Sequence, residues 1–117
     1  MVFIMDPVNW KNDSLTRIRR FAEKLFGEKL EAVILFGSYA REDNDAESDF
    51  DVMILVDLDA NTLAAYEYEF ARFGTDLDLE YGVFHSFVLQ DKETFEYWKE
   101  TIPFFKNVTE EGIVVNA

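Results

Sequence analysis

The chain has 117 residues, of which 49% are hydrophobic and none is cysteine, and its formal net charge at pH 7 is −13. The hydrophobic content excludes global disorder, and the absence of cysteine excludes disulfides and thiolate metal sites. No apolar run approaches the roughly 20 residues that cross a bilayer. Residues 2–5 are apolar but lack a basic start, so they are not predicted to be a signal peptide. We expect one cytoplasmic domain over residues 1–117.

The charge is unevenly distributed along the sequence. Residues 1–30 contain six basic and four acidic side chains, whereas the other residues contain five basic and twenty acidic ones. Between Glu42 and Glu80 there are thirteen acids and one base, Arg72. Such a surface disfavours tight, nonspecific binding of DNA or RNA. It suits a basic protein partner or a nucleotide accompanied by a metal ion, although most of these acids are expected simply to form a solvated face.

The first half of the chain contains one amphipathic stretch and two hydrophobic runs. Apolar residues recur at three- and four-residue spacing in the first stretch, which predicts a helix that faces a core. The second hydrophobic run is almost continuously apolar, which is typical of a central strand covered on both faces. The predicted elements are a helix capped by Asn12 or Asp13 and ended by Gly27, a strand over residues 31–36, a short helix from Ser38, an acidic turn over residues 43–48 and a strand over residues 50–56.

The second half is predicted to alternate helices with strands. Gly74 interrupts the longest helical stretch at a cost of about 1 kcal/mol relative to alanine, so the helix could break there. The predicted elements are a helix over about residues 61–81, a strand over residues 83–90, a helix from Asp91 to about Thr101, a helical turn from Pro103 and a strand over residues 113–115 after Gly112. Strands interleaved with helices indicate an α/β (α+β) domain with a small mixed sheet packed against helices.

Two polar motifs lie at the ends of the first two predicted strands. Gly37-Ser38 follows the first strand, and Asp49-Phe50-Asp51 opens the second. Because side chains alternate between the faces of a strand, Asp49 and Asp51 (the aspartate pair) project from one face, about 7 Å apart. The two carboxylates repel each other unless a cation lies nearby. Mg²⁺ (or Mn²⁺) is the expected cation, because it binds carboxylates together with substrate phosphates. Glycine and a helix start favour the approach of a phosphate, so the motifs predict a nucleotide site.

Each candidate residue also has a simpler structural interpretation. The aspartate pair could be exposed acids at a strand entry, and Ser38 could be a helix N-cap whether or not it also contacts phosphate. Arg41 could reach a triphosphate or could form a surface ion pair with Glu42 or Asp45. His85, the only histidine, lies in an apolar stretch and is predicted to be a core or sheet-surface residue rather than a catalytic one.

The spacing of Gly-Ser, ten residues and then Asp-x-Asp resembles the signature of the nucleotidyltransferase superfamily related to DNA polymerase β. The resemblance is strongest over residues 35–56, which include Arg41, and is visible again over residues 103–114. It is closest to the minimal, single-domain members of the superfamily. The resemblance implies a polymerase β-like nucleotidyltransferase fold in which Gly37, Ser38 and Arg41 contact the nucleotide and the aspartate pair holds the metal ion and serves catalysis.

The same resemblance implies an activity and a partner. Such an enzyme would move a nucleoside monophosphate from a nucleoside triphosphate, with ATP as the expected donor, to a hydroxyl acceptor. Minimal members are commonly paired with a helical HEPN-domain ribonuclease toxin, which some of them neutralise by adenylylation. The resemblance therefore predicts an antitoxin-like transferase with a HEPN-domain-like protein partner.

The sequence departs from the superfamily pattern at one point. Catalytic members usually carry a third carboxylate on the strand paired with the Asp-x-Asp strand, and residues 83–88 contain no acid. Asp78 and Glu80 lie just before this strand and are the candidates for a third acid. Without one, the chain could be a nucleotide-binding module that has lost turnover and neutralises a basic partner by direct binding. The enzyme is the preferred hypothesis because the aspartate pair and the Gly-Ser turn occur together.

Overall fold

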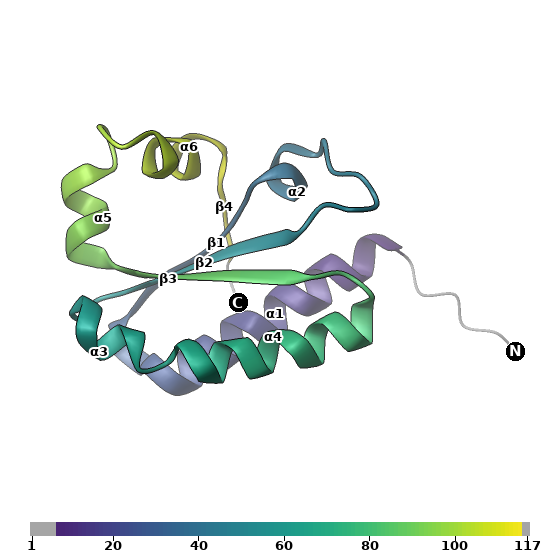
Figure 1. Cartoon of the computed structure of the whole chain (residues 1–117), viewed down its shortest axis with the longest axis horizontal. Coiled ribbons are helices and arrows are strands. Elements are labelled where there is room, and N and C mark those ends of the chain that lie inside the picture. The colour runs from purple at the N-terminus through teal and green to yellow at the C-terminus, as the bar shows by residue number, and fades with distance from the viewer. Residues whose placement is uncertain (1–6, 116–117) are drawn as a thin grey trace, which may run out of the picture.

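The computed structural model describes residues 7–115, so residues 2–5 lie outside it (Figure 1). The helices and strands interleave along the chain, and the predicted mixed α/β class is confirmed. No helix in the described part of the chain is long and apolar enough to cross a membrane. In chain order the elements are α1 (Pro7–Phe26), the 3₁₀ helix η1 (Gly27–Lys29), β1 (Leu30–Phe36), α2 (Ser38–Arg41), β2 (Phe50–Val56), α3 (Ala60–Ala64), α4 (Glu67–Tyr81), β3 (His85–Asp91), α5 (Lys92–Trp98), α6 (Pro103–Glu111) and β4 (Ile113–Val114).

The four strands form one mixed sheet with the order β3-β2-β1-β4. β1 pairs antiparallel with β2 and with β4, whereas β3 pairs parallel with β2. β2 therefore has a neighbour along each edge, and every residue of it except Asp51 is buried. Burial on both faces explains why this strand is almost continuously apolar in sequence, and the prediction of a central strand is confirmed.

Different helices cover the two faces of the sheet (Figure 1). α1 and α4 lie side by side on one face, where they pack against Phe50, Val52 and Ile54 of β2. α5 and α6 lie on the other face, where they pack against Met53 and Leu55. Figure 1 places α2 on the same side of the sheet as α6. Because side chains alternate along β2, Asp51 projects toward the side of α2 and α6 rather than into the core beneath α1 and α4.

The first helix begins earlier than its sequence indicates. Asn12 and Asp13 were expected to cap it, but the helix begins at Pro7, and both residues are exposed within it. The additional turn carries Trp10, whose ring centroid lies 5.2 Å from that of Phe50 and 5.9 Å from that of Tyr39. This aromatic packing stabilises the extra turn, so tertiary contacts override the local preference for a cap at Asn12 or Asp13.

Two predictions for the second half also need correction. The long helix breaks at Ala65 and Tyr66, between α3 and α4, and not at Gly74. Gly74 is buried inside α4, where a Cβ would lie 3.0 Å from the ring of Phe87. The glycine therefore lets α4 approach β3 closely instead of ending the helix. The turn predicted from Pro103 is a nine-residue helix, α6.

A buried chain of hydrogen bonds joins α1, β3 and α4. The Ser14 hydroxyl lies 2.8 Å from Nε2 of His85, and Nδ1 of His85 lies 3.0 Å from Asp78 Oδ1 and 2.9 Å from the Val83 carbonyl. Both groups beside Nδ1 are acceptors, so Nδ1 carries the hydrogen and Nε2 accepts from Ser14. The order Ser-His-Asp is that of a hydrolase triad, but Ser14 is fully buried and cannot reach a substrate. His85 is therefore a core residue, as predicted.

We expect Ser14→Ala to lower the free energy of unfolding by about 1–3 kcal/mol, because it leaves the buried Nε2 of His85 without a donor. Urea unfolding measures this change. Asn12→Ala, at an exposed position on the same helix, is the matched control and should change stability by no more than about 0.5 kcal/mol. Equal effects of the two substitutions would show that the buried chain does not hold α1 in place.

Candidate active site

The connection from β1 to α2 depends on a glycine at position 37. Gly37 has a φ of +75°, which disfavours residues with a side chain. A Cβ built on Gly37 would overlap Oδ2 of Asp51 and would lie 3.3 Å from its Cγ. The turn and the carboxylate of the neighbouring strand therefore approach each other closely only because Gly37 has no side chain.

Ser38 lies directly after this turn, as the first residue of α2. It was expected to cap the helix, but Gly37 occupies the N-cap position and provides no side-chain cap. The expectation of a serine cap is therefore wrong. α2 is a single turn, from Ser38 to Arg41, and the N–H groups at the start of a helix have no partner within it.

The two members of the aspartate pair differ in their surroundings. Asp51 is half-buried in β2, whereas Asp49, just before the strand, is exposed. Burial raises the pKa of Asp51, the negative charge of Asp49 raises it further, and the positive charge of Arg41 partly offsets both effects. Charge is therefore disfavoured at Asp51 in the folded protein, and a cation beside the pair would relieve the repulsion.

Arg41 lies at the end of α2 and is held by two acids. Its Nε donates to Asp43 at 3.1 Å, and its Nη1 donates to Glu111, at the end of α6, at 3.3 Å. These hydrogen bonds, above all the one to Asp43, raise the pKa of Arg41. The surface ion pair considered from the sequence exists, but with these partners and not with Glu42 or Asp45. Exposed pairs of this kind are weak, so a more highly charged anion could compete for the guanidinium.

The structure does not bring either candidate for a third acid to the aspartate pair. Asp78 and Glu80 lie on α4, which covers the opposite face of the sheet. Asp78 accepts hydrogen bonds from the His85 backbone and ring, and Glu80 pairs with Arg17 at 2.6 Å. Among residues 7–115, no group of three or more His, Asp or Glu side chains is arranged to hold a metal ion. Neither Asp78 nor Glu80 therefore completes the aspartate pair as a third acid.

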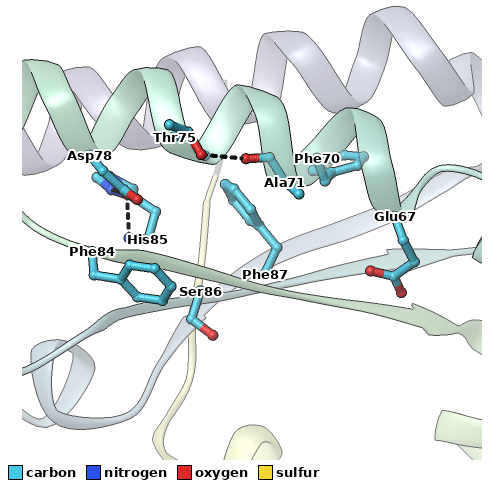
Figure 2. Close-up of a pocket in the computed structure, with 10 residues that line it drawn as sticks. Glu67, Phe70, Ala71, Thr75, Asp78, Phe84, His85, Ser86 and Phe87 are labelled. Atoms are coloured by element: carbon cyan, nitrogen blue, oxygen red, sulfur yellow. Dashed lines mark hydrogen bonds and ion pairs between the residues drawn. The ribbon is translucent and has the colours of Figure 1, made fainter.

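Ser86 is a residue of this region that the sequence reasoning missed. The parallel register pairs it with Asp51, so the two side chains project from the same face of the sheet. Figure 2 shows its hydroxyl pointing away from α4, whereas the neighbouring side chains of His85 and Phe87 point toward that helix. The run around Ser86 carries no recognisable motif, and only the pairing of β3 with β2 reveals its position.

A hollow of about 320 Å³ lies between α4 and β3 on the other side of the sheet (Figure 2). Its lining includes Phe70, Phe87, Asp78 and Ser86, the last on the edge strand β3, but neither member of the aspartate pair. The hollow is thus separate from the Gly37 turn, and its walls offer mainly aromatic rings and carboxylates. We assign it no part in nucleotide binding.

A mixed sheet that presents a glycine turn against a half-buried carboxylate has the architecture expected of a nucleotidyltransferase. The sequence profile described as the nucleotidyltransferase domain matches residues 15–115, and the chain belongs to this family. It is accordingly an enzyme of the transferase class.

Relatives and solved structures agree with this assignment. A protein of Methanocaldococcus jannaschii named as a protein adenylyltransferase is 38% identical over 87 residues, which cover 74% of this chain and 79% of that one. A crystal structure described as a nucleotidyltransferase, from Sulfolobus solfataricus, superimposes with a TM-score of 0.59 and 18% identity over 97% of this chain and 89% of that one. A chain of the MntA-HpeT toxin-antitoxin gives a TM-score of 0.51 and 18% identity over 86% of this chain and 70% of that one. At these identities the two structures support the fold.

We expect Asp51→Asn to raise the midpoint of thermal unfolding, because it removes a charge that burial and Asp49 disfavour. The gain should be largest near neutral pH. It should begin to decline as the pH falls through the raised pKa of Asp51, and it should vanish below the ordinary pKa of an aspartate, where the wild-type carboxyl is neutral in both the folded and the unfolded chain. Scanning calorimetry at several pH values measures it. Glu47→Gln, which removes one exposed acid from the nearby turn, is the control for net charge, and an equal gain there would contradict the explanation.

Proposed function

We propose that the protein transfers a nucleoside monophosphate from a nucleoside triphosphate, with ATP as the donor, to a hydroxyl group on a partner protein. The close approach of Gly37 to Asp51 carries this proposal. It sets an open backbone turn, which can accept a phosphate, against carboxylates that can hold a cation bound to the same phosphate. Gly37, Ser38 and Arg41 would bind the triphosphate, and the aspartate pair would hold Mg²⁺ or Mn²⁺.

The residues present fit a hard divalent cation. The pair offers only oxygen donors, and because burial and the charge of Asp49 raise the pKa of Asp51, a nearby cation would stabilise its charged form. Two carboxylates, together with water and phosphate oxygens, suffice for one octahedral shell. When bound, such an ion neutralises charge on the phosphates and so favours nucleophilic attack.

In the proposed reaction, the acceptor hydroxyl oxygen forms a bond to the α-phosphorus of the triphosphate. The bond from that phosphorus to the bridging oxygen breaks, pyrophosphate leaves and the hydroxyl proton passes to solvent. The contribution of the chain is mainly to position the reacting groups and to neutralise charge. Gly37 and Ser38 orient the phosphates, and the half-buried Asp51 is held in place by the register of β2.

The acceptor is proposed to belong to a HEPN-domain-like toxin. The M. jannaschii relative is named as an enzyme that acts on protein, and the sequence resembles minimal members that are paired with such toxins. The thirteen acids between Glu42 and Glu80 would attract a basic partner. Membership of the nucleotidyltransferase family favours transfer over the alternative of a module that only masks a basic surface.

Transfer can be tested directly by incubating the protein with each α-labelled triphosphate, Mg²⁺ and the protein encoded by the neighbouring gene. We expect label from ATP on the partner protein and its loss with Asp49→Asn, because a single remaining carboxylate holds the cation weakly. Calorimetry of Mg²⁺-ATP binding to the same variant gives an independent readout.

The other outcomes of this experiment are equally informative. Label on RNA would identify a nucleic-acid acceptor. Binding of the partner without transfer of any label, with an affinity that falls steeply as salt rises, would support the binding module instead.

We expect Ser38→Ala to weaken triphosphate binding by about 1–3 kcal/mol, the contribution of a hydrogen bond to a charged group. Calorimetric titration with ATP and Mg²⁺ measures the change. Thr75→Ala removes a hydroxyl from the exposed face of α4, on the other side of the sheet, and should leave the affinity unchanged. If Ser38→Ala binds as tightly as Thr75→Ala does, the Gly-Ser turn is only a connection between β1 and α2.

A further inference from the structure

Ser86 extends the candidate site across a third strand. The β1–β2 register pairs Phe36 with Asp51, and the β2–β3 register pairs Asp51 with Ser86, so the three side chains form a row on one face of the sheet. The hydrogen bonds that hold this end of β3 run through His85 and not through Ser86. The Ser86 hydroxyl therefore faces the site without serving the buried hydrogen-bond chain.

The spacing of the strands fits an indirect contact between Ser86 and a cation on Asp51. Neighbouring strands lie about 4.8 Å apart. A ligand oxygen lies about 2.1 Å from Mg²⁺, and a hydroxyl lies about 2.8 Å from the water to which it hydrogen-bonds. Because these last two lengths together match the strand spacing, Ser86 would be able to hold a water bound to a cation on Asp51.

The charge around the pair also limits how many cations it can hold. A second divalent ion would need further anionic oxygens, and within residues 7–115 no group of three His, Asp or Glu side chains is arranged to hold a metal ion. In the protein without nucleotide, three acids near the pair already have partners. Asp43 and Glu111 pair with Arg41, and Asp45 bonds to Ser48 and to the backbone of Glu47.

We infer that the site binds one divalent cation per chain, together with the nucleotide, and that Ser86 is a positioning residue that holds a water of the cation's shell. This inference rests on the proposed function. Ser86 provides a hydroxyl where a carboxylate would attract a second ion, so the β3 side of the site remains uncharged. Ser86 thereby sets the metal stoichiometry of the site without coordinating the cation itself.

Counting Mn²⁺ by electron paramagnetic resonance, with a non-hydrolysable ATP analogue present, tests the inference without a measurement of activity. The wild type should bind one Mn²⁺ per chain, and Ser86→Asp should bind two. Gln90→Glu adds the same charge on the same face of β3, but in register with Leu55 rather than with Asp51, and should bind one. Ser86→Ala should retain one Mn²⁺ with an affinity reduced about tenfold, as expected when an outer-shell partner is lost.

Two Mn²⁺ ions in the wild type would overturn the inference, as would a count for Ser86→Asp equal to that for Gln90→Glu or an unchanged affinity for Ser86→Ala. If the wild type binds the analogue with no Mn²⁺ at all, both the inference and the proposed metal site fail. A different Mn²⁺ count or an unchanged Ser86→Ala affinity would leave the proposed function intact, whereas binding of the analogue without any Mn²⁺ would not. The failure of the inference can therefore be distinguished from the failure of the proposed function. If Ser86→Asp does not fold, as judged by circular dichroism, the wild-type count and the Ser86→Ala affinity still decide the question.

Discussion

The carboxylate of Asp51 occupies the space that a side chain at position 37 would fill, and the antiparallel register of β1 and β2 holds it there. A slip of one residue would turn Asp51 to the opposite face of the sheet and would expose Phe50 in its place. Phe50 is fully buried against Trp10 and Tyr39, so such a slip would remove an aromatic ring from the core. Hydrophobic packing on one face thus fixes the position of a charge on the other.

This arrangement places the larger hydrophobic core on one face of the sheet, and a smaller core together with the candidate site on the other. α1 and α4 enclose the larger core, and the buried chain from Ser14 through His85 to Asp78 joins them to β3. The other face carries Asp51, which resists ionisation because of burial and a neighbouring charge. Folded proteins tolerate such unfavourable placement mainly where it serves function. A cation bound beside Asp51 would relieve this unfavourable charge.

Local patterns in the sequence were enough to locate most elements, because apolar periodicity and glycine positions are local signals. β2 and the stop at Gly27 follow from the residues alone. The start of α1 at Pro7 could not be predicted from the local sequence, because it depends on contacts of Trp10 with the rings of Phe50 in β2 and Tyr39 in α2. The break at Ala65 and Tyr66 was missed because Gly74 suggested a different one, whereas this glycine serves the packing of α4 on Phe87.

The same distinction applies to the site. Gly37, Ser38 and the aspartate pair lie within fifteen residues and form a recognisable motif. Ser86 and the engagement of Asp78 by His85 depend on strand pairing and helix packing between distant segments, which no local pattern encodes. The placement of the Gly-Ser turn against Asp51 could therefore be anticipated, whereas the neighbours that complete or restrict the site could not.

The acidic turn between α2 and β2 bonds mainly to itself, since the side chain of Asp45 accepts from Ser48 and from the backbone of Glu47. Both strands that frame the site are anchored by the sheet and not by this turn. Doubling the length of a flexible loop costs only about 0.6 kcal/mol in closure entropy. Natural selection can therefore change the length or the charged residues of this turn with little effect on the positions of β1 and β2. Sequence changes can thus accumulate in the turn while the arrangement of Gly37 and Asp51 is retained.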